Sequence, residues 1–335
     1  MKIAVLGATG AVGRTMLRVL EERAFPVDEL VLLASERSAG TRMSCMGREW
    51  VVQAVSADAF EGCDFALFSA GAARSRQWAP IAAQHGAIVI DNSSGWRMDP
   101  DVPLVVPEVN ARRALNPPRG IIANPNCATI QLVVALEALR RAAGLERVVV
   151  TTLQSVSGAG NKGISTLDQE LAGTRAEQTP FVARIAHNVI PFIGPRGADG
   201  WNEEEEKIRA ETRKILELPD LPVAATCVRV PVRVGHSISA TVQTSRMLSR
   251  DRALAAMRDM TGIAEVNERD PLPIEAAGTD HVFVGHVRED HDVANTLHLW
   301  IVADNLRKGA ATNAVQIAEA IIATRAATPG ARRHA

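Results

Sequence analysis

Residues 2–13 read Lys2-Ile3-Ala4-Val5-Leu6-Gly7-Ala8-Thr9-Gly10-Ala11-Val12-Gly13 and carry the clearest structural signal in the chain. An apolar run is followed by a glycine-rich turn and then by the helical pattern of Arg14–Arg23. In this strand-turn-helix context, glycines let backbone N–H groups and a helix N-terminus approach a pyrophosphate. The segment therefore predicts a dinucleotide site formed by Gly7, Thr9, Gly10, Ala11, Val12 and Gly13.

The first part of the chain alternates short apolar runs with segments of helical length. The predicted strands are Ile3–Leu6, Leu30–Ala34, Phe65–Ser69 and Ala87–Asp91, and the helices between them include Arg14–Arg23 and Ser75–Gln84. This alternation is typical of a doubly wound parallel sheet of Rossmann type, in an α/β fold.

From about Val148 the pattern changes to longer strands, which indicates a second domain of α+β class. The predicted strands are Val148–Gln154, Ala224–Pro231 and His236–Thr244, and the predicted helices are Lys162–Leu171, Glu203–Leu216 and Arg252–Met260. The four glutamates 203–206 are expected on a solvated helix face. Thr312–Thr324 is a strongly apolar final helix, and we expect the tail 328–335 to be disordered.

Length and composition indicate an ordinary globular protein that acts on a small molecule. The 335 residues favour about two domains. Hydrophobic content of 47%, charged content of 22% and a net charge of −1 leave no basic excess for nucleic acid or an anionic membrane. Nothing at the N-terminus resembles a signal peptide, and no apolar run approaches the about 18 residues of a spanning helix. We therefore expect neither secretion nor membrane insertion.

The four cysteines are widely spaced and form no C-x-x-C pair: Cys45, Cys63, Cys127 and Cys227. This pattern argues against a disulfide framework and against a structural zinc site, and no metal site is predicted. A reducing cytoplasm fits best.

The turn after the second predicted strand favours NADP over NAD. An NAD enzyme would place an acid there for the ribose 2′-hydroxyl, whereas this chain has Ser35, Arg37 and Ser38, which suit a 2′-phosphate. Glu36 keeps NAD possible. The chain contains no tyrosine, which excludes the short-chain reductases and sugar epimerases that share such glycine spacing but need a catalytic tyrosine.

Cys127 lies at the predicted N-terminus of a buried helix, within Asn124-Pro125-Asn126-Cys127-Ala128-Thr129-Ile130-Gln131. Asn126 can cap this helix, and the unpaired N–H groups of the first turn favour a thiolate over a thiol. This placement indicates a nucleophile. The alternative is a buried cysteine that acts as a small hydrophobic residue.

Seven segments together resemble the aspartate-semialdehyde dehydrogenase family, and they run from residue 3 to about residue 320. They are Gly7–Gly13, Ser35–Gly40, Asp91–Met98, Asn124–Gln131, Gln154–Gly160, Arg229–Ser237 and Asp304–Ala311. The resemblance implies an NADP-dependent phosphorylating aldehyde dehydrogenase. Such an enzyme interconverts aspartyl 4-phosphate and aspartate semialdehyde through a cysteine thioester, on the branch that leads to lysine, threonine and methionine.

The resemblance also implies a role for each matching residue. Cys127 corresponds to the nucleophile, His236 to the acid/base and Gln154 to a residue that orients the substrate. The substrate ligands would be Arg229 for the α-carboxylate, Glu204 for the amino group, and Lys207 and Arg97 for phosphate. Ser157, Gly158 and Asn305 would lie near the cofactor. Leu153 departs from the aromatic residue that the family usually has, and the run of glutamates allows Glu204 to slip by one position.

By the same resemblance, residues 1–127 form the dinucleotide-binding domain, completed by the C-terminal helix at about 312–328. Residues 128–311 form the catalytic and dimerisation domain of a cytoplasmic homodimer. From position alone, an exposed surface histidine is the favoured interpretation of His236, and the resemblance reverses this preference. Two other functions stay open: an N-acetyl-γ-glutamyl-phosphate reductase, disfavoured by Asn124–Cys127 and the Glu204/Lys207 pair, and a non-catalytic relative that binds nucleotide.

Overall fold

The structure is a computed structural model, and it describes residues 1–174, 176–264 and 269–327. The chain divides into two compact units, each described below by itself. The first comprises Met1–Pro125 and the described residues after Gly309, and the second is Asn126–Gly309. Cys127, which we expected at the end of the first domain, therefore lies in the second unit. The predicted tail 328–335 lies outside the described residues.

A parallel sheet with the order β5-β2-β1-β6-β7-β8 forms the centre of the first unit. This is the strand order of a dinucleotide-binding sheet. From β1 the chain adds strands on one side of the sheet, and it then crosses over to add β6 and the later strands on the other side. Every residue of β6 and β7 is buried, as expected for parallel strands covered on both faces. The strands are β1 (Lys2–Leu6), β2 (Glu29–Ala34), β5 (Gln53–Ala54), β6 (Phe65–Phe68), β7 (Ile88–Asp91) and β8 (Ile121–Ala123).

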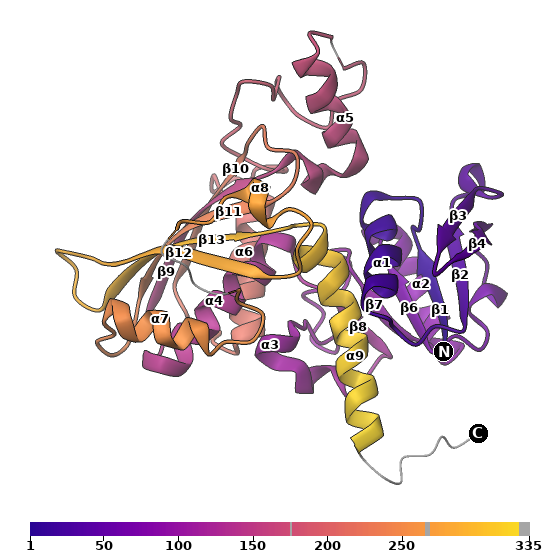
Figure 1. Ribbon diagram of the computed structural model, residues 1–335, viewed down its shortest axis with the longest axis horizontal. Helices are drawn as coiled ribbons and strands as arrows, with labels where there is room; N and C mark the ends of the chain where they lie inside the picture. Colours follow the sequence, from indigo (N-terminus) through magenta and orange to yellow (C-terminus); the bar gives the residue numbers. More distant parts are fainter. Residues whose placement is uncertain (175, 265–268, 328–335) are drawn as a thin grey trace. The chain divides into compact units, whose positions relative to one another are not determined.

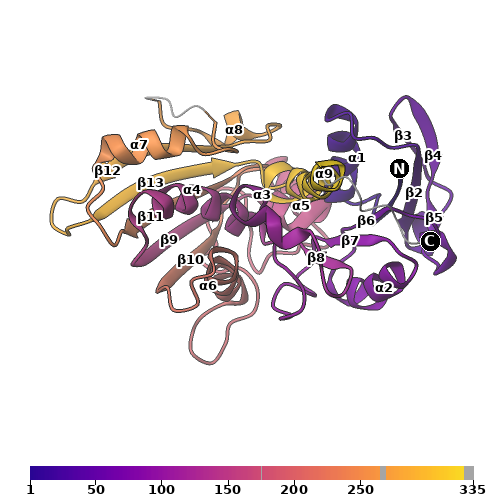
Figure 2. The same ribbon diagram turned by 90° about the horizontal axis from the view of Figure 1, so that it is seen from below.

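Helices cover both faces of this sheet, with α1 and α9 on one side and α2 on the other (Figure 2). Their bounds are α1 (Ala11–Glu22), α2 (Ala72–Gln84), α3 (Pro107–Asn110) and α9 (Thr312–Ala327). Apolar residues of α1 and α9 join one core with β1 and β2. The predicted starts of α1 and α2 were three residues late, because Gly10 and Gly71 act as N-caps with non-helical backbone. A small hairpin of β3 (Arg42–Cys45) and β4 (Arg48–Val51) follows the 3-10 turn η1 (Glu36–Ser38).

The second unit contains a mixed sheet with the order β10-β9-β11-β13-β12. β9 and β10 run parallel, and the other neighbours are antiparallel. The sequence predicted three of these strands, and β12 and β13 were missed. The bounds are β9 (Arg147–Gln154), β10 (Val223–Arg229), β11 (His236–Gln243), β12 (Val282–Glu289) and β13 (Thr296–Ala303).

Helices cover one face of this sheet, with α4 packed between α6 and α7 (Figure 1). Strand β9 alternates exposed and buried residues along its length, so its second face is open. No described helix is long and apolar enough to cross a bilayer. The helices are α4 (Cys127–Ala143), α5 (Gly160–Leu171), α6 (Glu203–Leu216), α7 (Arg250–Arg258) and α8 (Pro273–Ala276), and the 3-10 turn η4 (Val156–Ala159) precedes α5.

Candidate active site

Cys127 is the first residue of α4, at the end of the helix where backbone N–H groups are unpaired. Asn126 caps this end, because its Oδ1 accepts hydrogen bonds from the N–H groups of Ala128 at 2.9 Å and Thr129 at 3.3 Å. The thiol is partly accessible, whereas the other three cysteines are buried. The predicted cap is confirmed, and it leaves Cys127 in the positive field of the helix N-terminus.

Two buried glutamates hold Asn126 in place. Its side-chain Nδ2 donates to Oε1 of Glu204 at 2.7 Å, and its backbone N–H donates to Oε2 of Glu211 at 2.6 Å. Glu211 on α6 is 1% exposed. No sequence pattern indicated a role for Glu211, because a glutamate on an amphipathic helix ordinarily faces water.

The imidazole of His236 lies against the thiol, with Nε2 3.2 Å from Sγ of Cys127. His236 begins β11 and is fully buried, so the alternative of an exposed surface histidine is wrong. Its Nδ1 accepts a hydrogen bond of 3.0 Å from the backbone N–H of Ser155. A neutral ring with an accepting Nδ1 carries its proton on Nε2, which faces the sulfur.

The surroundings of His236 favour this neutral form. Burial, and then the positive charge of Arg229, hold the pKa of the imidazole well below its ordinary value of 6.5. His236 can therefore donate from Nε2 to a thiolate without carrying a positive charge at neutral pH.

A buried polar network holds the loop that orients His236. Oδ1 of Asn305 accepts from the hydroxyls of Ser155 at 3.0 Å and Ser157 at 2.9 Å, and from the N–H of Gly235 at 3.0 Å. Ser157 and Asn305 were predicted near the cofactor, and here their side chains bond to each other next to the histidine. Ser155 was not predicted, although it directly follows Gln154.

Gln154 and Arg229 are paired neighbours on β9 and β10. Nε2 of Gln154 donates to Oε1 of Glu204 at 3.2 Å, and Nη1 of Arg229 donates to the backbone oxygen of Ser155 at 2.7 Å. Arg229 is buried, which lowers its pKa, while the carboxylate of Glu204 opposes this shift. The second unit thus gathers a thiol, an imidazole, an amide, a carboxylate and a guanidinium.

The structure gives the register of the glutamate run. Glu204 faces Gln154, whereas Glu203 is exposed and pairs with Lys207 at 2.8 Å. Glu205 forms a capping box with Asn202, and Glu206 pairs with Arg209. The expected solvated face is therefore wrong for Glu204 and Glu205, which are both 8% exposed. Lys207 lies 3.7 Å from Glu204, at the edge of the cluster.

Two glycines are required by close approach to these groups. A Cβ at Gly158 would lie 2.7 Å from Nη1 of Arg229, and one at Gly309 would lie 3.0 Å from Cβ of Cys127. Both distances are shorter than ordinary carbon contacts. These glycines therefore leave space for the functional side chains.

The glycine loop of the first unit forms the predicted strand-turn-helix. Gly7 has φ +90°, and a Cβ there would lie 2.4 Å from the carbonyl oxygen of Ser69. A Cβ at Gly13 would lie 2.2 Å from the oxygen of Gly7. Both positions therefore exclude any side chain, and the backbone N–H groups of Thr9–Val12 lie at the start of α1.

A pocket of about 430 Å³ lies beside this loop, at the carboxyl ends of β1 and β2. Of the three turn residues that the sequence suggested for a 2′-phosphate, Ser35 and Arg37 line this pocket, and Ser38 is not part of its lining. The full lining is Leu6, Ala34, Ser35, Glu36, Arg37, Ala54, Val55, Ala70, Arg74, Gln77 and Trp78.

Arg97 also belongs to the first unit and is largely buried. Its Nε donates to the carbonyl oxygen of Asn124 at 3.0 Å, and its Nη2 donates to that of Asn92 at 2.8 Å. These bonds fix the guanidinium on the chain that leads to Cys127.

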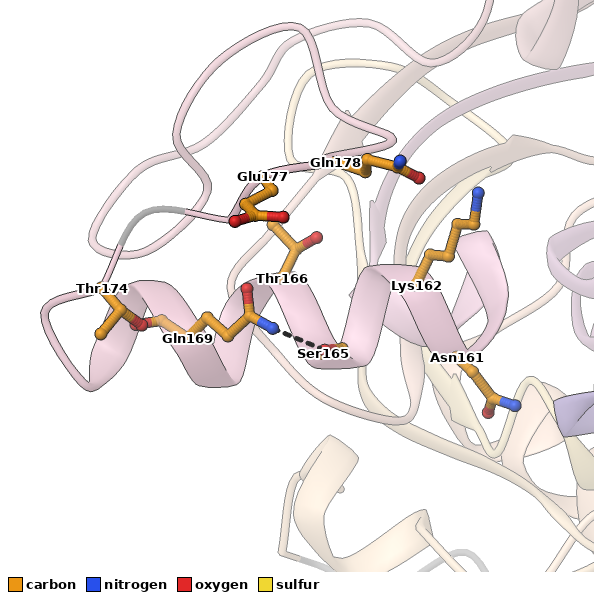
Figure 3. A pocket seen from close by; sticks show the side chains of 8 residues that line it. All are labelled: Asn161, Lys162, Ser165, Thr166, Gln169, Thr174, Glu177 and Gln178. Atoms are coloured by element: carbon orange, nitrogen blue, oxygen red, sulfur yellow. Dashed lines mark hydrogen bonds between the residues drawn. The ribbon is translucent and has the colours of Figure 1, made fainter.

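A second pocket, of about 690 Å³, lies along α5 and contains none of the predicted site residues. Figure 3 shows its polar side chains and the hydrogen bond of 3.1 Å from Gln169 to Ser165. Its lining is Asn161, Lys162, Ser165, Thr166, Gln169, Thr174, Glu177 and Gln178.

Comparison with known proteins shows the family. Residues 2–116 match the family model "Semialdehyde dehydrogenase, NAD binding domain", and residues 136–308 match "Semialdehyde dehydrogenase, dimerisation domain". The aspartate-semialdehyde dehydrogenase of Aquifex aeolicus is 50% identical, over 96% of this chain and 98% of that protein. The chain belongs to the aspartate-semialdehyde dehydrogenase family.

Solved structures agree with this family assignment. Aspartate semialdehyde dehydrogenase II of Vibrio cholerae, complexed with ASA, has a TM-score of 0.93 and 48% identity, covering 96% of this chain and 98% of that one. The family's enzyme from Candida albicans, determined with NADP, has a TM-score of 0.75 and 25% identity, covering 97% and 99%. As a member of the aspartate-semialdehyde dehydrogenase family, the chain is an oxidoreductase with a domain for a nicotinamide cofactor.

Proposed function

We propose that the chain converts aspartyl 4-phosphate into aspartate semialdehyde by NADPH-dependent reductive dephosphorylation, in the synthesis of lysine, threonine and methionine. The observation that carries the proposal is the contact of 3.2 Å between Sγ of Cys127 and Nε2 of His236. A thiol at a helix N-terminus with an imidazole N–H beside it is equipped for covalent acyl chemistry.

In this proposal the thiolate of Cys127 attacks the acyl carbon, and the bond from that carbon to the phosphate oxygen breaks. The acyl group becomes a thioester on Cys127, and phosphate leaves with its electron pair. The reduced nicotinamide, when bound, supplies the hydride that reduces the thioester. The bond between sulfur and carbon then breaks, which releases the aldehyde and regenerates the thiolate.

His236 holds its proton at Nε2 throughout the attack. There it stabilises the thiolate and donates to the negative charge that develops beside the sulfur. The amide of Gln154 orients the acyl group, and its bond to Glu204 fixes the amide plane.

Each charged group of the substrate is bound by a residue of opposite charge. Arg229 binds the α-carboxylate with its planar fork, and Glu204 binds the α-ammonium group. Lys207 and Arg97 bind the phosphate. The buried position of Arg229 and Glu204 supports these roles, because buried charges require partners of opposite sign.

The cofactor is proposed to be NADP, held by the loop Gly7–Gly13 and by Ser35, Arg37 and Ser38. Ser157, Gly158 and Asn305 are proposed to lie near the nicotinamide. Two observations support the binding of NADP at this site. Gly7 and Gly13 leave no room for a Cβ, and Ser35 and Arg37 line a pocket beside the loop.

The chain is further proposed to act as a cytoplasmic homodimer. The matched dimerisation domain and the open face of β9 support the dimer. The four free thiols support a reducing compartment.

The test is an assay of the purified protein with NADP and phosphate, using two aldehydes. Aspartate semialdehyde should give phosphate-dependent NADPH formation, and N-acetylglutamate semialdehyde should give little. A preference for the longer, acylated aldehyde would reverse the substrate assignment. Cofactor binding without turnover of either aldehyde would indicate a non-catalytic relative.

A further inference from the structure

The pocket beside the glycine loop takes one wall from α2. Because α2 follows β6, which neighbours β1 in the sheet, its first turns reach the carboxyl end of β1. Arg74, Gln77 and Trp78 line the pocket. Their spacing of three and four residues places all three side chains on one face of the helix.

The aromatic part of this wall is fixed by packing. Trp78 is partly buried, and its ring lies 6.3 Å from the ring of Phe60, measured between centroids. A fixed indole at a nucleotide pocket provides a flat surface for a purine base.

The charged groups of the pocket are Glu36, Arg37 and Arg74. Across residues 1–174, 176–264 and 269–327, none of these three side chains takes part in a hydrogen bond or ion pair. With Glu36 and Arg37 alone, the pocket would be neutral. Arg74 makes its net charge positive.

We infer that Arg74 determines the preference of this pocket for a 2′-phosphorylated adenosine over an adenosine with a free 2′-hydroxyl. The inference rests on the proposed NADP-dependent function. It adds to the predicted turn residues a cation from a different element, α2, which no sequence motif indicated.

The physical reason is the charge of the ligand. A phosphate monoester carries about −1.5 to −2 charges at neutral pH and accepts several hydrogen bonds. Two guanidinium groups without partners can neutralise it and bind it through their forked N–H groups. A 2′-hydroxyl carries no charge that Arg74 could neutralise. It can instead donate a hydrogen bond to the carboxylate of Glu36.

The experiment measures binding rather than turnover. Titration calorimetry would give the affinities of NADP, NAD, adenosine 2′,5′-bisphosphate and 5′-AMP for wild type, Arg74→Ala, Arg74→Lys and Arg76→Ala. Arg76 is the matched control, because it lies on the same helix and its Nε donates to the carbonyl oxygen of Gly95 at 3.3 Å, outside the pocket lining.

Arg74→Ala should weaken the binding of NADP and of the bisphosphate about tenfold. The effect is limited to this size because the site is open to solvent, where a charged hydrogen bond contributes less than in a buried site. The affinities of Arg74→Ala for NAD and 5′-AMP should equal those of wild type. Arg76→Ala should bind all four ligands as wild type does, and Arg74→Lys should retain part of the preference for NADP over NAD. An unchanged ratio of NADP to NAD affinity in Arg74→Ala, or an equal loss in Arg76→Ala, would overturn the inference alone. A wild type that binds NAD as tightly as NADP would overturn the proposed cofactor as well.

Discussion

The backbone N–H of Ser155 donates a hydrogen bond of 3.0 Å to Nδ1 of His236. A backbone donor cannot change its protonation, so it fixes the ring with a lone pair on Nδ1 and a proton on Nε2. The same ring places Nε2 3.2 Å from Sγ of Cys127. Ser155, which directly follows Gln154 at the end of β9, thus determines which ring nitrogen of His236 presents its proton to the sulfur.

The buried histidine should make the fold sensitive to acid. The pKa of His236 lies well below 6.5 in the folded protein, so the unfolded chain binds more protons as the pH falls. Titration of His236 therefore leaves the free energy of unfolding unchanged above about pH 6.5. Below that pH it lowers the free energy of unfolding, by at most about 1.4 kcal/mol per pH unit. Urea unfolding between about pH 7.5 and about pH 5.5 should show a smaller loss in His236→Gln than in wild type. The exposed His281→Gln variant should match wild type, and equal losses in all three proteins would contradict the prediction.

Alkylation should select Cys127 among the four cysteines. Burial raises the pKa of Cys45 and of Cys63 to about 11, and that of Cys227 to about 12. Because the thiolate is the reactive form, iodoacetamide near neutral pH should modify Cys127 about a hundredfold faster than the others. Peptide mapping would measure the rates, and aspartate semialdehyde should slow the reaction at Cys127. Comparable labelling of a second cysteine would count against the assignment.

Two arginines of one chain segment should differ in their effect on catalysis. Arg229→Ala should lower kcat/KM for aspartate semialdehyde by about 10- to 100-fold, because it removes a charged hydrogen bond to the substrate. Arg229→Lys should not restore it, because a lysine lacks the planar fork. Arg233 is 60% exposed and pairs with Asp168, so Arg233→Ala should change little. Equal effects at the two positions would remove the carboxylate role of Arg229.

The open sheet face should form the proposed dimer interface. Thr241 lies opposite His298 on neighbouring strands, and its Oγ1 is 3.0 Å from Nδ1 of that histidine. An arginine at position 241 would bring two like charges into a symmetric interface, so Thr241→Arg should shift the protein towards monomer in sedimentation velocity. Gln84→Arg, on an exposed position of α2, is the control. A dimer of unchanged stability in Thr241→Arg would place the interface elsewhere.

Much of the fold could be predicted because the signals were local. The apolar run before Gly7 and the cap at Asn126 each depend on neighbouring residues, and both are confirmed. β12 was missed because a bulge between Gly285 and Arg288 interrupts the alternation of its side chains. β13 was missed together with its hairpin partner.

The missed site residues act through partners that are distant in sequence. Glu211 accepts a hydrogen bond from the backbone of Asn126. Arg74 and Arg37 line the same pocket only because the sheet places β2 and β6 on either side of β1. A glutamate or arginine on a helix is ordinarily solvated, so sequence pattern could not distinguish these residues from surface charges. The resemblance to the family supplied roles for His236 and Arg229 that their positions alone could not.

The central claim is that Cys127 carries the acyl group, and peptide mapping by mass spectrometry tests it most directly. Wild-type protein is mixed with aspartate semialdehyde and NADP without phosphate, quenched in acid and digested. One aspartyl adduct per chain, mapped to the peptide that contains Cys127, is the predicted result, and Cys127→Ser should show none. NADPH formation in wild type without an adduct on Cys127, or an adduct that persists in Cys127→Ser, would contradict the claim.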